Sequence, residues 1–311
     1  MTRRQFLQVT AALALAGRVQ AAPDAAWFAG ARQFAVTRFG KIAYIDRGRG
    51  EAVLFMHGFP LNSYQWRGAI ERLSADRRCI AADMMAHGLT EAADGQDMAV
   101  TAQASMLASL LDKLGVDKVD VIASDSGGAV AQIFMTRYPE RVRTLLLTNC
   151  DVEPDSPPPA VAPVIELARK GLYAEKWLVP WVNDKALARS PKGLGGLCFT
   201  RPAELSDQTI DCYLGPMVSS AKRKAQIDAY AMALAPNPLM GIEPELKRSQ
   251  VPVRILWGMA DKIFSPASPD YLDKLLPKSQ GVRRIEEANL FWPEEYPDLI
   301  AEEARKLWRI A

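Results

Sequence analysis

Short apolar runs alternate with helical patterns from residue 34 to residue 150, as is typical of strands joined by helical crossovers. The pattern predicts strands at 34–39, 41–46, 52–56, 79–83, 119–123 and 144–149. Helices fit 61–73, 100–114 and 127–137. The second of these helices repeats its apolar residues along one face, which favours a helix that packs on a sheet. The first half of the chain therefore predicts a parallel sheet covered by helices.

The strand pattern disappears between about residues 151 and 249, an interval that opens with several prolines and continues as irregular helices rich in Trp, Tyr and Met. Beyond it, two apolar runs predict strands at 253–257 and 282–285, and an amphipathic helix is expected at 293–310. We therefore expect an α/β fold with a mostly parallel eight-stranded sheet flanked by helices. Its core comprises residues 22–150 and 250–311, and residues 151–249 form an inserted helical lid.

The composition is that of a globular protein, because 49% of the 311 residues are hydrophobic and 24% are charged. These fractions exclude a disordered chain, a collagen and a coiled-coil array. Three of the 38 basic residues lie within residues 1–21, where no acidic residue occurs. The rest of the chain has 35 basic and 36 acidic side chains, a net charge of −1. We therefore expect neither a nucleic acid nor an anionic membrane as a partner.

The first 21 residues resemble a twin-arginine signal peptide. Arg3 and Arg4 precede a mildly apolar run, and the small residues before Ala22 suit a signal peptidase. The run is about half the ~20 residues that span a bilayer, which makes a retained anchor helix the weaker alternative. We expect cleavage before Ala22 and export to the periplasm or beyond, with no stable membrane anchor afterwards.

The chain has four cysteines and two histidines, His57 and His87. No cluster of these residues has the spacing of metal ligands, so we expect no metal site and no cofactor. An oxidising destination permits one disulfide bond. Cys198 and Cys212 could close a loop that stabilises the fold by about 3 kcal/mol.

The most informative segment is an apolar strand that ends in a tight turn around Asp125 and enters a helix. A nucleophile on such a turn is strained, and the residues two places before and after it must be small. Ala123 and Gly127 meet this demand around Asp125, and the neighbours of Ser126 would meet it as well. The segment therefore offers two candidate nucleophiles, unless it is only a structural turn.

The run from Ala123 to Gly128 resembles the small-x-Asp-x-Gly-Gly pattern of the α/β-hydrolase fold family. The similarity is to members with an aspartate nucleophile, such as haloalkane dehalogenases and epoxide hydrolases. In this pattern the two glycines follow two and three places after the nucleophile, which selects Asp125 over Ser126. The resemblance implies that Asp125 attacks the substrate.

A second motif, His57-Gly58-Phe59-Pro60, is similar to the loop that forms half of the oxyanion hole in this family. The resemblance implies that the amides of Phe59 and Ser126 form the hole. It assigns a structural role to His57. His87 lies in a match to the family's Asp-x-x-Gly-His-Gly segment, with Ala86 in place of a glycine, and is also expected to be structural.

The strand predicted at 253–257 leads to Asp261, which the resemblance implies is the acid of a catalytic triad. Asp151, just after the strand at 144–149, is the alternative position that some members use. Asp151 could also cap the turn that follows it, and this is the interpretation we favour from the sequence.

The chain departs from the family at the third catalytic position, since Leu290 stands where the resemblance requires histidine. An aspartate can still attack an alkyl carbon, because a carboxylate is ionised at neutral pH. Hydrolysis of the resulting ester needs a base to activate water, and leucine supplies none. A serine nucleophile would need the base even for the first step.

The side chains that define the two nearest activities are only partly present. Dehalogenases of this family hold the halide with a Trp after the nucleophile and an Asn or Trp in the oxyanion loop, whereas this chain has Ser126 and Phe59. Epoxide hydrolases use two lid tyrosines, for which Tyr173, Tyr213 and Tyr230 are available. The lid's aromatic and Met side chains suit an apolar pocket or simply a core between helices.

We therefore expect an exported α/β-hydrolase-fold enzyme that cleaves an ester, epoxide or carbon–halogen bond in a small apolar substrate. Asp125 is central and Asp261 supports it, and without histidine the two carboxyl groups would share a proton as acid and base. The alternative is a catalytically dead relative that binds a ligand or traps it covalently on Asp125.

Overall fold

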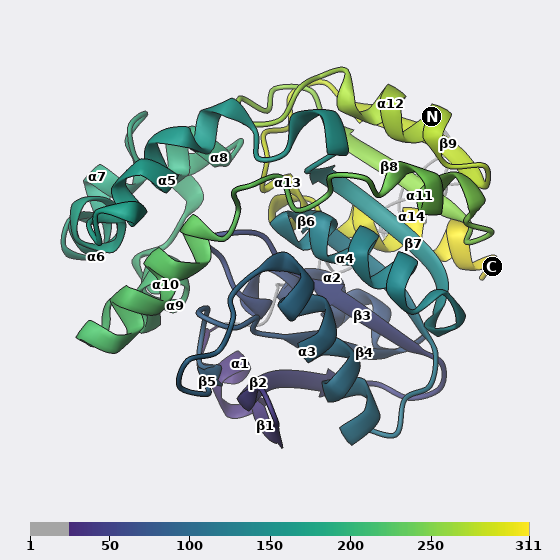
Figure 1. Cartoon of the computed structure of the whole chain (residues 1–311), viewed down its shortest axis with the longest axis horizontal. Helices are drawn as coiled ribbons and strands as arrows, with labels where there is room; N and C mark the ends of the chain where they lie inside the picture. The colour runs from purple at the N-terminus through teal and green to yellow at the C-terminus, as the bar shows by residue number, and fades with distance from the viewer. Residues whose placement is uncertain (1–24, 311) are drawn as a thin grey trace, which may run out of the picture.

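The computed structural model describes residues 25–310; the expected signal peptide, residues 1–21, lies outside the described residues. A mixed sheet runs through the centre of the molecule (Figure 1), and within the described residues it has nine strands in the order β1-β2-β4-β3-β6-β7-β8-β9, with β5 beside β2. The pairs that involve β2 are antiparallel and the others are parallel. The strands are β1 (Gln33–Thr37), β2 (Gly40–Arg47), β3 (Ala52–Met56), β4 (Arg78–Ala82), β5 (Glu91–Ala92), β6 (Val119–Asp125), β7 (Val142–Cys150), β8 (Val253–Gly258) and β9 (Ser279–Ile285).

The eight predicted strands are all present, within three residues at each end, and the α/β-hydrolase architecture is confirmed. The prediction of eight strands needs one correction within residues 25–310, because the two-residue strand β5 makes a ninth. β9 begins at Ser279, earlier than predicted. The prediction missed its first residues because they are polar or glycine and show no apolar pattern.

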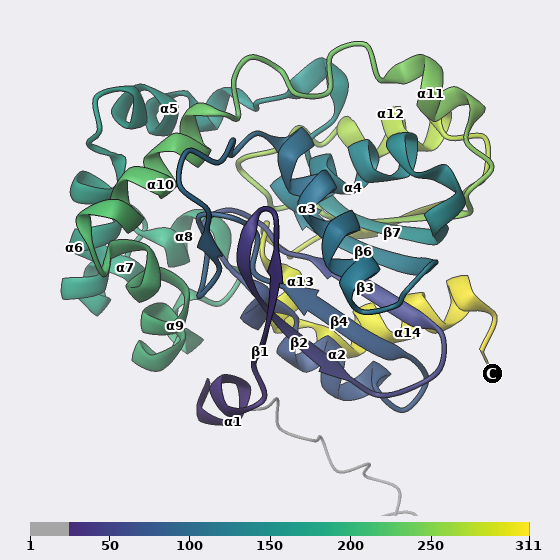
Figure 2. The same cartoon turned by 60° about the horizontal axis from the view of Figure 1, so that its bottom comes forward.

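Helices cover both faces of the sheet (Figure 2). α3 (Val100–Lys113) and α4 (Ser126–Arg137) pack on one face, and α2 (Arg67–Leu73) and α14 (Pro297–Trp308) pack together on the other. α12 (Ser268–Leu275) packs against β8 and β9.

Two predicted helices are divided in the structure. The helix expected at 61–73 consists of a 3-10 turn, Ser63–Trp66, followed by α2. The helix expected at 293–310 is divided into α13 (Trp292–Glu295) and α14, with the break at Tyr296. The residue before a proline avoids the helical conformation, which explains a break just before Pro297.

The helical insertion follows β7 and projects from one side of the sheet (Figure 1). It contains α5 (Ala162–Arg169), a π-helical turn (Ala174–Leu178), α6 (Val179–Asn183), α7 (Lys185–Arg189), α8 (Leu194–Cys198), α9 (Asp207–Val218) and α10 (Ala221–Met232). α11 (Glu243–Arg248), which we expected to belong to the lid, already contacts α4 and α12 of the core. In the part of the chain that is described, no helix is long and apolar enough to cross a membrane.

Buried polar contacts fix the lid to the core. The guanidinium of Arg67 in α2 pairs with Glu294 of α13 at 2.7 Å, and Tyr213 of α9 donates its hydroxyl to the same carboxylate. In α10, Arg223 donates to the carbonyl oxygens of Thr90 and Gly88, each at 2.7 Å. The lid is therefore held from several core elements.

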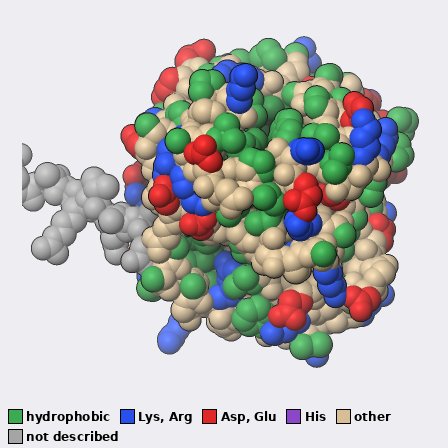
Figure 3. Space-filling model, turned by 90° about the vertical axis from the view of Figure 1, so that its left-hand side faces the viewer, with side chains coloured by type: hydrophobic (Ala, Val, Ile, Leu, Met, Phe, Trp, Pro, Cys, Tyr) green, Lys and Arg blue, Asp and Glu red, His purple; other side chains and the backbone are tan. Residues whose placement is uncertain are grey.

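The outer face of the lid carries basic and acidic side chains interspersed with hydrophobic ones (Figure 3). Within the lid, Lys224 of α10 forms an ion pair with Glu175. Cys198 and Cys212 are both free thiols, so the disulfide bond considered from the sequence is absent from the structure. The main-chain oxygen of Cys212 instead accepts a hydrogen bond from Asn62 Nδ2 at 2.8 Å, which links α9 to the core.

Candidate active site

The turn between β6 and α4 holds Asp125 in a strained conformation. Its φ of 56° and ψ of −135° lie in a region that costs a non-glycine residue about 1–3 kcal/mol. A Cβ at Gly58 would lie 2.6 Å from the Cβ of Asp125, and one at Gly127 would lie 2.4 Å from the carbonyl oxygen of His57. The loop after β3 can approach the turn this closely because both positions are glycine.

The carboxyl group of Asp125 lies against the amides of both residues predicted to form the oxyanion hole. The N–H of Phe59 donates to Asp125 Oδ1 at 2.7 Å. The residue is only 6% exposed, and this burial raises the pKa of Asp125 to about 6, although hydrogen bonds from the amides of Ser126 and Phe59 oppose the shift. The structure thus brings together Asp125, Phe59 and Ser126, with the carboxylate ionised at neutral pH.

Ser126 is less suited to be the nucleophile than Asp125. Its hydroxyl oxygen accepts a hydrogen bond from Tyr230 of α10 at 2.9 Å, and the ring of Tyr230 stacks on Phe59. Neither histidine is hydrogen-bonded to Ser126, so no imidazole is in place to remove its proton. Tyr230 is a site residue that sequence reasoning could only name among three tyrosines, because it belongs to no motif.

His57 has a structural role, as the family resemblance implies. Its Nδ1 lies 2.9 Å from the carbonyl oxygen of Gly58, and its Nε2 accepts the N–H of Met84 at 2.9 Å. Burial lowers the pKa of His57 to about 4, so the ring is neutral at pH 7. Both ring nitrogens are occupied by main-chain groups, which leaves His57 unable to serve a substrate.

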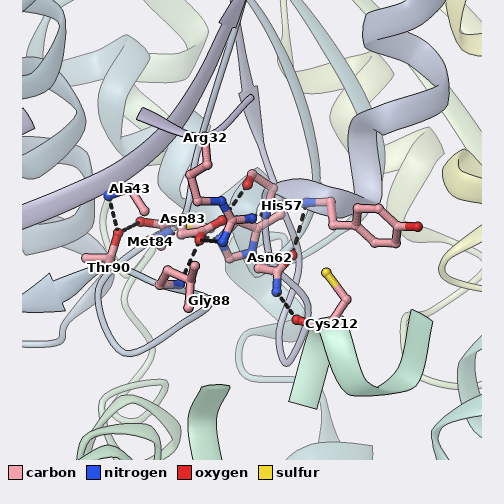
Figure 4. Close-up of polar contacts among 12 residues, drawn as sticks. Arg32, Ala43, His57, Asn62, Asp83, Met84, Gly88, Thr90 and Cys212 are labelled. Atoms are coloured by element: carbon pink, nitrogen blue, oxygen red, sulfur yellow. Dashed lines mark hydrogen bonds and ion pairs between the residues drawn. The ribbon is translucent and has the colours of Figure 1, made fainter. Parts of the chain in front are cut away.

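A buried carboxylate beside His57 braces the oxyanion loop (Figure 4). Asp83 pairs with Arg32 at 3.1 Å and accepts the main-chain N–H groups of Ser63 and Leu89 at 3.0 and 2.8 Å. In the same turn, Ala86 has a φ of 72°, a conformation that glycine adopts more readily. Asp83, paired with Arg32, therefore stabilises the loop that carries Phe59 through its hydrogen bond with Ser63.

Asp261, predicted to be the acid, does not line the cavity above Asp125. Its Oδ1 accepts the N–H of Ile263 at 2.7 Å, and its Oδ2 accepts Asn149 Nδ2 at 2.8 Å. Burial raises the pKa of Asp261 to about 6, and the charge of Asp125 adds a smaller contribution. Both of its oxygens are engaged in bracing the turn after β8, so it is not the group that shares the cavity with Asp125.

Asp151 does share that cavity. It directly follows β7, whose last residue, Cys150, pairs in register with Asp125 at the end of β6. Ser156 Oγ donates to Asp151 Oδ1 at 2.8 Å, so Asp151 also braces the following turn, as we favoured from the sequence. Burial, followed by the charge of Asp125, raises the pKa of Asp151 to about 8, which keeps the carboxyl group protonated at neutral pH.

The cavity has a volume of about 230 Å³ and lies between the core and the lid. Its walls are mainly hydrophobic, and its charged or hydroxyl side chains are those of Asp125, Ser126, Asp151, Tyr173 and Lys262. The remaining lining residues are Phe59, Pro60, Pro157, Pro158, Ala160, Val161, Val164, Trp177, Trp181, Leu194, Leu197, Cys198, Leu234, Ile263, Phe264 and Leu290. Such a site suits a small, largely apolar molecule.

Leu290 lies on the cavity wall and is only 2% exposed. Its loop is tied to the lid, because Asn289 Nδ2 donates to the carbonyl oxygens of Leu197 and Phe199, and Phe291 N donates to that of Cys198 at 2.8 Å. An apolar side chain thus faces the substrate space at the position where the family resemblance requires a base. Between residues 25 and 310, no group of His, Cys, Asp and Glu residues is arranged to hold a metal ion.

Comparison with known proteins identifies the family. Residues 51–289 match the family model described as the alpha/beta hydrolase fold. The chain belongs to the α/β-hydrolase fold family. It is 28% identical over 245 residues to a cis-3-alkyl-4-alkyloxetan-2-one decarboxylase of Shewanella oneidensis, covering 75% of this chain and 74% of the relative. It is 25% identical over 303 residues to haloalkane dehalogenase 2 of Mycobacterium tuberculosis, covering 89% and 92%.

Solved structures of other α/β hydrolases show the same fold. An epoxide hydrolase superposes with a TM-score of 0.73 at 20% identity, covering 89% of this chain and 98% of the other. An ancestral haloalkane dehalogenase superposes with a TM-score of 0.72 at 23% identity, covering 89% and 99%. The resemblance to dehalogenases and epoxide hydrolases that the motifs indicated is therefore confirmed.

Proposed function

We propose that this α/β hydrolase is an enzyme that acts on small, largely apolar electrophiles, namely esters, epoxides or organohalides, through attack by the Asp125 carboxylate. The observation that supports this most strongly is the strained Asp125, whose Oδ1 receives the Phe59 amide at 2.7 Å beneath a hydrophobic cavity. The names of relatives are consistent with such substrates, since they include a haloalkane dehalogenase and an epoxide hydrolase.

The arrangement suits a covalent first step. One carboxylate oxygen is held by the amide of Phe59, which leaves the other to bond to an electrophilic carbon while the leaving group departs. With an epoxide or an organohalide the product is an alkyl ester of Asp125, whereas attack on the acyl carbon of an ester gives a mixed anhydride. The amides of Phe59 and Ser126 then surround the ester's carbonyl oxygen, where they can stabilise the negative charge that develops when water attacks.

The alternative function, a protein that traps its ligand covalently, is favoured by one observation. Leu290 supplies no base, so the ester of Asp125 persists unless another group in the cavity activates water. The trap and the enzyme share the first step and differ in the fate of the ester, and both depend on Asp125.

We expect 1-bromohexane to add one hexyl group to the protein, on the peptide that contains Asp125. Intact-mass spectrometry followed by peptide mapping measures the addition. Asp125→Asn should abolish it, because a neutral amide is a poor nucleophile, whereas Ser126→Ala should retain it. An adduct that survives in Asp125→Asn and is lost in Ser126→Ala would transfer the role to Ser126. A wild-type protein that is unmodified by alkyl bromide, epoxide and activated ester, and that turns none of them over, would contradict the proposal.

Export is a separate part of this proposal and rests on the sequence alone. Arg3, Arg4 and the small residues before Ala22 support the twin-arginine route, and all of them lie outside the described residues. A periplasmic or secreted location is therefore proposed on the signal pattern, with no contribution from the fold.

A further inference from the structure

Two aspartates, Asp125 and Asp151, line the same cavity at the ends of neighbouring parallel strands. Asp125 is the last residue of β6 and pairs in register with Cys150, the residue before Asp151. Adjacent strands lie about 4.8 Å apart, so the two aspartates are neighbours across the sheet. Both line the same cavity, and they are 6% and 5% exposed.

Neither aspartate has a cationic partner that would allow both to ionise. Across residues 25–310, Asp125 and Asp151 form no ion pair, and Lys262 on the cavity wall points its Nζ toward the carbonyl oxygen of Gly196 at 3.4 Å. Two neighbouring carboxylates in a buried site repel each other, so the pair retains a proton at neutral pH. Among the other titratable groups, the charge of Asp155 makes a small contribution to the raised pKa of Asp151. In addition to burial, the charge of Asp125 in turn raises the pKa values of Asp261, Cys150, Tyr173, Cys198 and Tyr230.

The hydrogen bonds around the pair decide which group holds the proton. Asp125 receives the N–H groups of Phe59 and Ser126, which favour its ionised form. Asp151 receives only the hydroxyl of Ser156 from a side chain, and its burial beside the charge of Asp125 raises its pKa to about 8, against about 6 for Asp125. At pH 7 Asp125 is therefore the carboxylate and Asp151 the neutral acid.

We propose that Asp151 carries out both proton transfers, the donation that epoxide hydrolases assign to lid tyrosines and the activation of water that the family assigns to histidine. This inference rests on the proposed function, and it makes Asp151 the proton donor in the first step and the proton acceptor in the second. It also favours a substrate whose carbon–oxygen bond breaks, such as an epoxide, over an organohalide.

The reaction balances for an epoxide. A carboxylate oxygen of Asp125 bonds to a ring carbon, the carbon–oxygen bond breaks, and the released oxygen takes the proton of Asp151. Water then attacks the ester carbonyl carbon of Asp125 while Asp151 accepts its proton. The tetrahedral intermediate collapses to the carboxylic acid of Asp125 and an alkoxide. The alkoxide takes the proton of that new carboxylic acid and leaves as the diol, so Asp125 ends ionised and Asp151 neutral. The sum is epoxide plus water giving diol.

An organohalide probe distinguishes nucleophilic attack by Asp125 from proton transfer by Asp151. A halide ion leaves without a proton, so alkylation of Asp125 by 1-bromohexane needs only the ionised carboxylate. Opening of 1,2-epoxyhexane needs the carboxylate and the acid together. Because the two probes carry similar apolar chains, the difference between them reports on Asp151.

The pH dependence should differ between the two probes. We expect alkylation by 1-bromohexane to be lost as the pH falls through about 6, where Asp125 becomes protonated, and to level off above it. Reaction with 1,2-epoxyhexane should lose rate below about pH 6 and again above about pH 8, where Asp151 loses its proton. Rates are measured by intact mass for the ester and by chromatography for the diol.

Asp151→Asn provides the decisive variant, since an amide keeps the size of the carboxyl group and cannot transfer the proton. We expect its reaction with 1,2-epoxyhexane at pH 7 to fall about 100-fold and to lose the limb near pH 8. Any hydroxyhexyl ester that the epoxide forms on Asp125 should persist in this variant, because no group accepts the proton of water. Alkylation by 1-bromohexane should stay near the wild-type rate, which also shows that the variant is folded.

Asp155→Asn is the matched control, because it removes a carboxylate from the same loop that does not line the cavity. We expect it to react with both probes at the wild-type rate at pH 7. The limb near pH 8 should move only slightly downward, because the charge of Asp155 makes the smallest contribution to the raised pKa of Asp151. Equal epoxide rates in Asp151→Asn and the wild type would overturn the inference and leave the proposed function intact. Absence of reaction of the wild type with both probes and with an activated ester would instead overturn the proposed function.

Discussion

Leu290→His is expected to accelerate hydrolysis of the Asp125 ester by about 100-fold, the lower end of what a positioned general base contributes. Leu290 lies on the wall of the cavity that contains Asp125, so an imidazole there would face the ester. The experiment forms the hexyl ester with 1-bromohexane, removes the excess reagent and follows the loss of the hexyl mass with time. The acceleration should disappear as the pH falls below about 6.5, where an unperturbed imidazole becomes protonated.

Leu290→Asn is the control for this experiment, because it introduces a polar group of similar size that is not a base. We expect it to leave the rate of ester loss close to that of the wild type. A folded Leu290→His protein whose ester is no shorter-lived than that of Leu290→Asn would contradict the idea that residue 290 faces the reacting carbonyl.

Glu294→Gln is expected to lower the free energy of unfolding by about 3 kcal/mol, because it leaves a largely buried cation without its counter-charge. Arg67 and Glu294 have side chains that are 15% and 6% exposed, and Tyr213 donates its hydroxyl to the same carboxylate. The cluster joins α2 and α13 of the core to α9 of the lid. Urea unfolding followed by tryptophan fluorescence measures the change.

A second ion pair between lid and core supplies the control. Lys222 Nζ in α10 lies 2.5 Å from Asp94 Oδ1, and the two side chains are 59% and 89% exposed. Exposed pairs contribute little to stability, so Asp94→Asn should leave the urea midpoint unchanged within error. Similar losses in the two variants would show that burial of the Arg67 cluster adds nothing.

The sequence marked most clearly the strands that are buried along their whole length, and it missed one very short strand and the polar start of another. β3 and β6 are buried along their whole length, so their apolar runs mark them clearly. β5 has only two residues, too few for any pattern, and the start of β9 is polar and partly exposed. The sequence wrongly placed α11 in the lid. Its place in the core follows from its packing against α4, and the spacing of apolar residues does not reveal which element a helix packs against.

The site was predictable where it depends on local turns. Asp125 and Ser126 belong to one turn and Phe59 to another, and the small residues that each turn requires are visible in the sequence. The partner of Asp125 was not predictable in this way. Asp151 approaches it through pairing of β6 with β7, whereas the carboxylate of Asp261 is engaged by the turn that follows its own strand.

The buried carboxyl groups of Asp125 and Asp151 also link the stability of the whole fold to proton uptake. In the unfolded chain both would titrate near pH 3.9. In the folded protein burial raises the pKa of Asp125 to about 6, and burial followed by the charge of Asp125 raises the pKa of Asp151 to about 8. Folding above pH 4 therefore takes up protons, and this contribution to stability is complete below about pH 4 and is lost as the pH rises through 6 and 8. Acidification from neutral pH thus strengthens the fold at this site, while below about pH 6 it removes the charge on which attack by Asp125 depends.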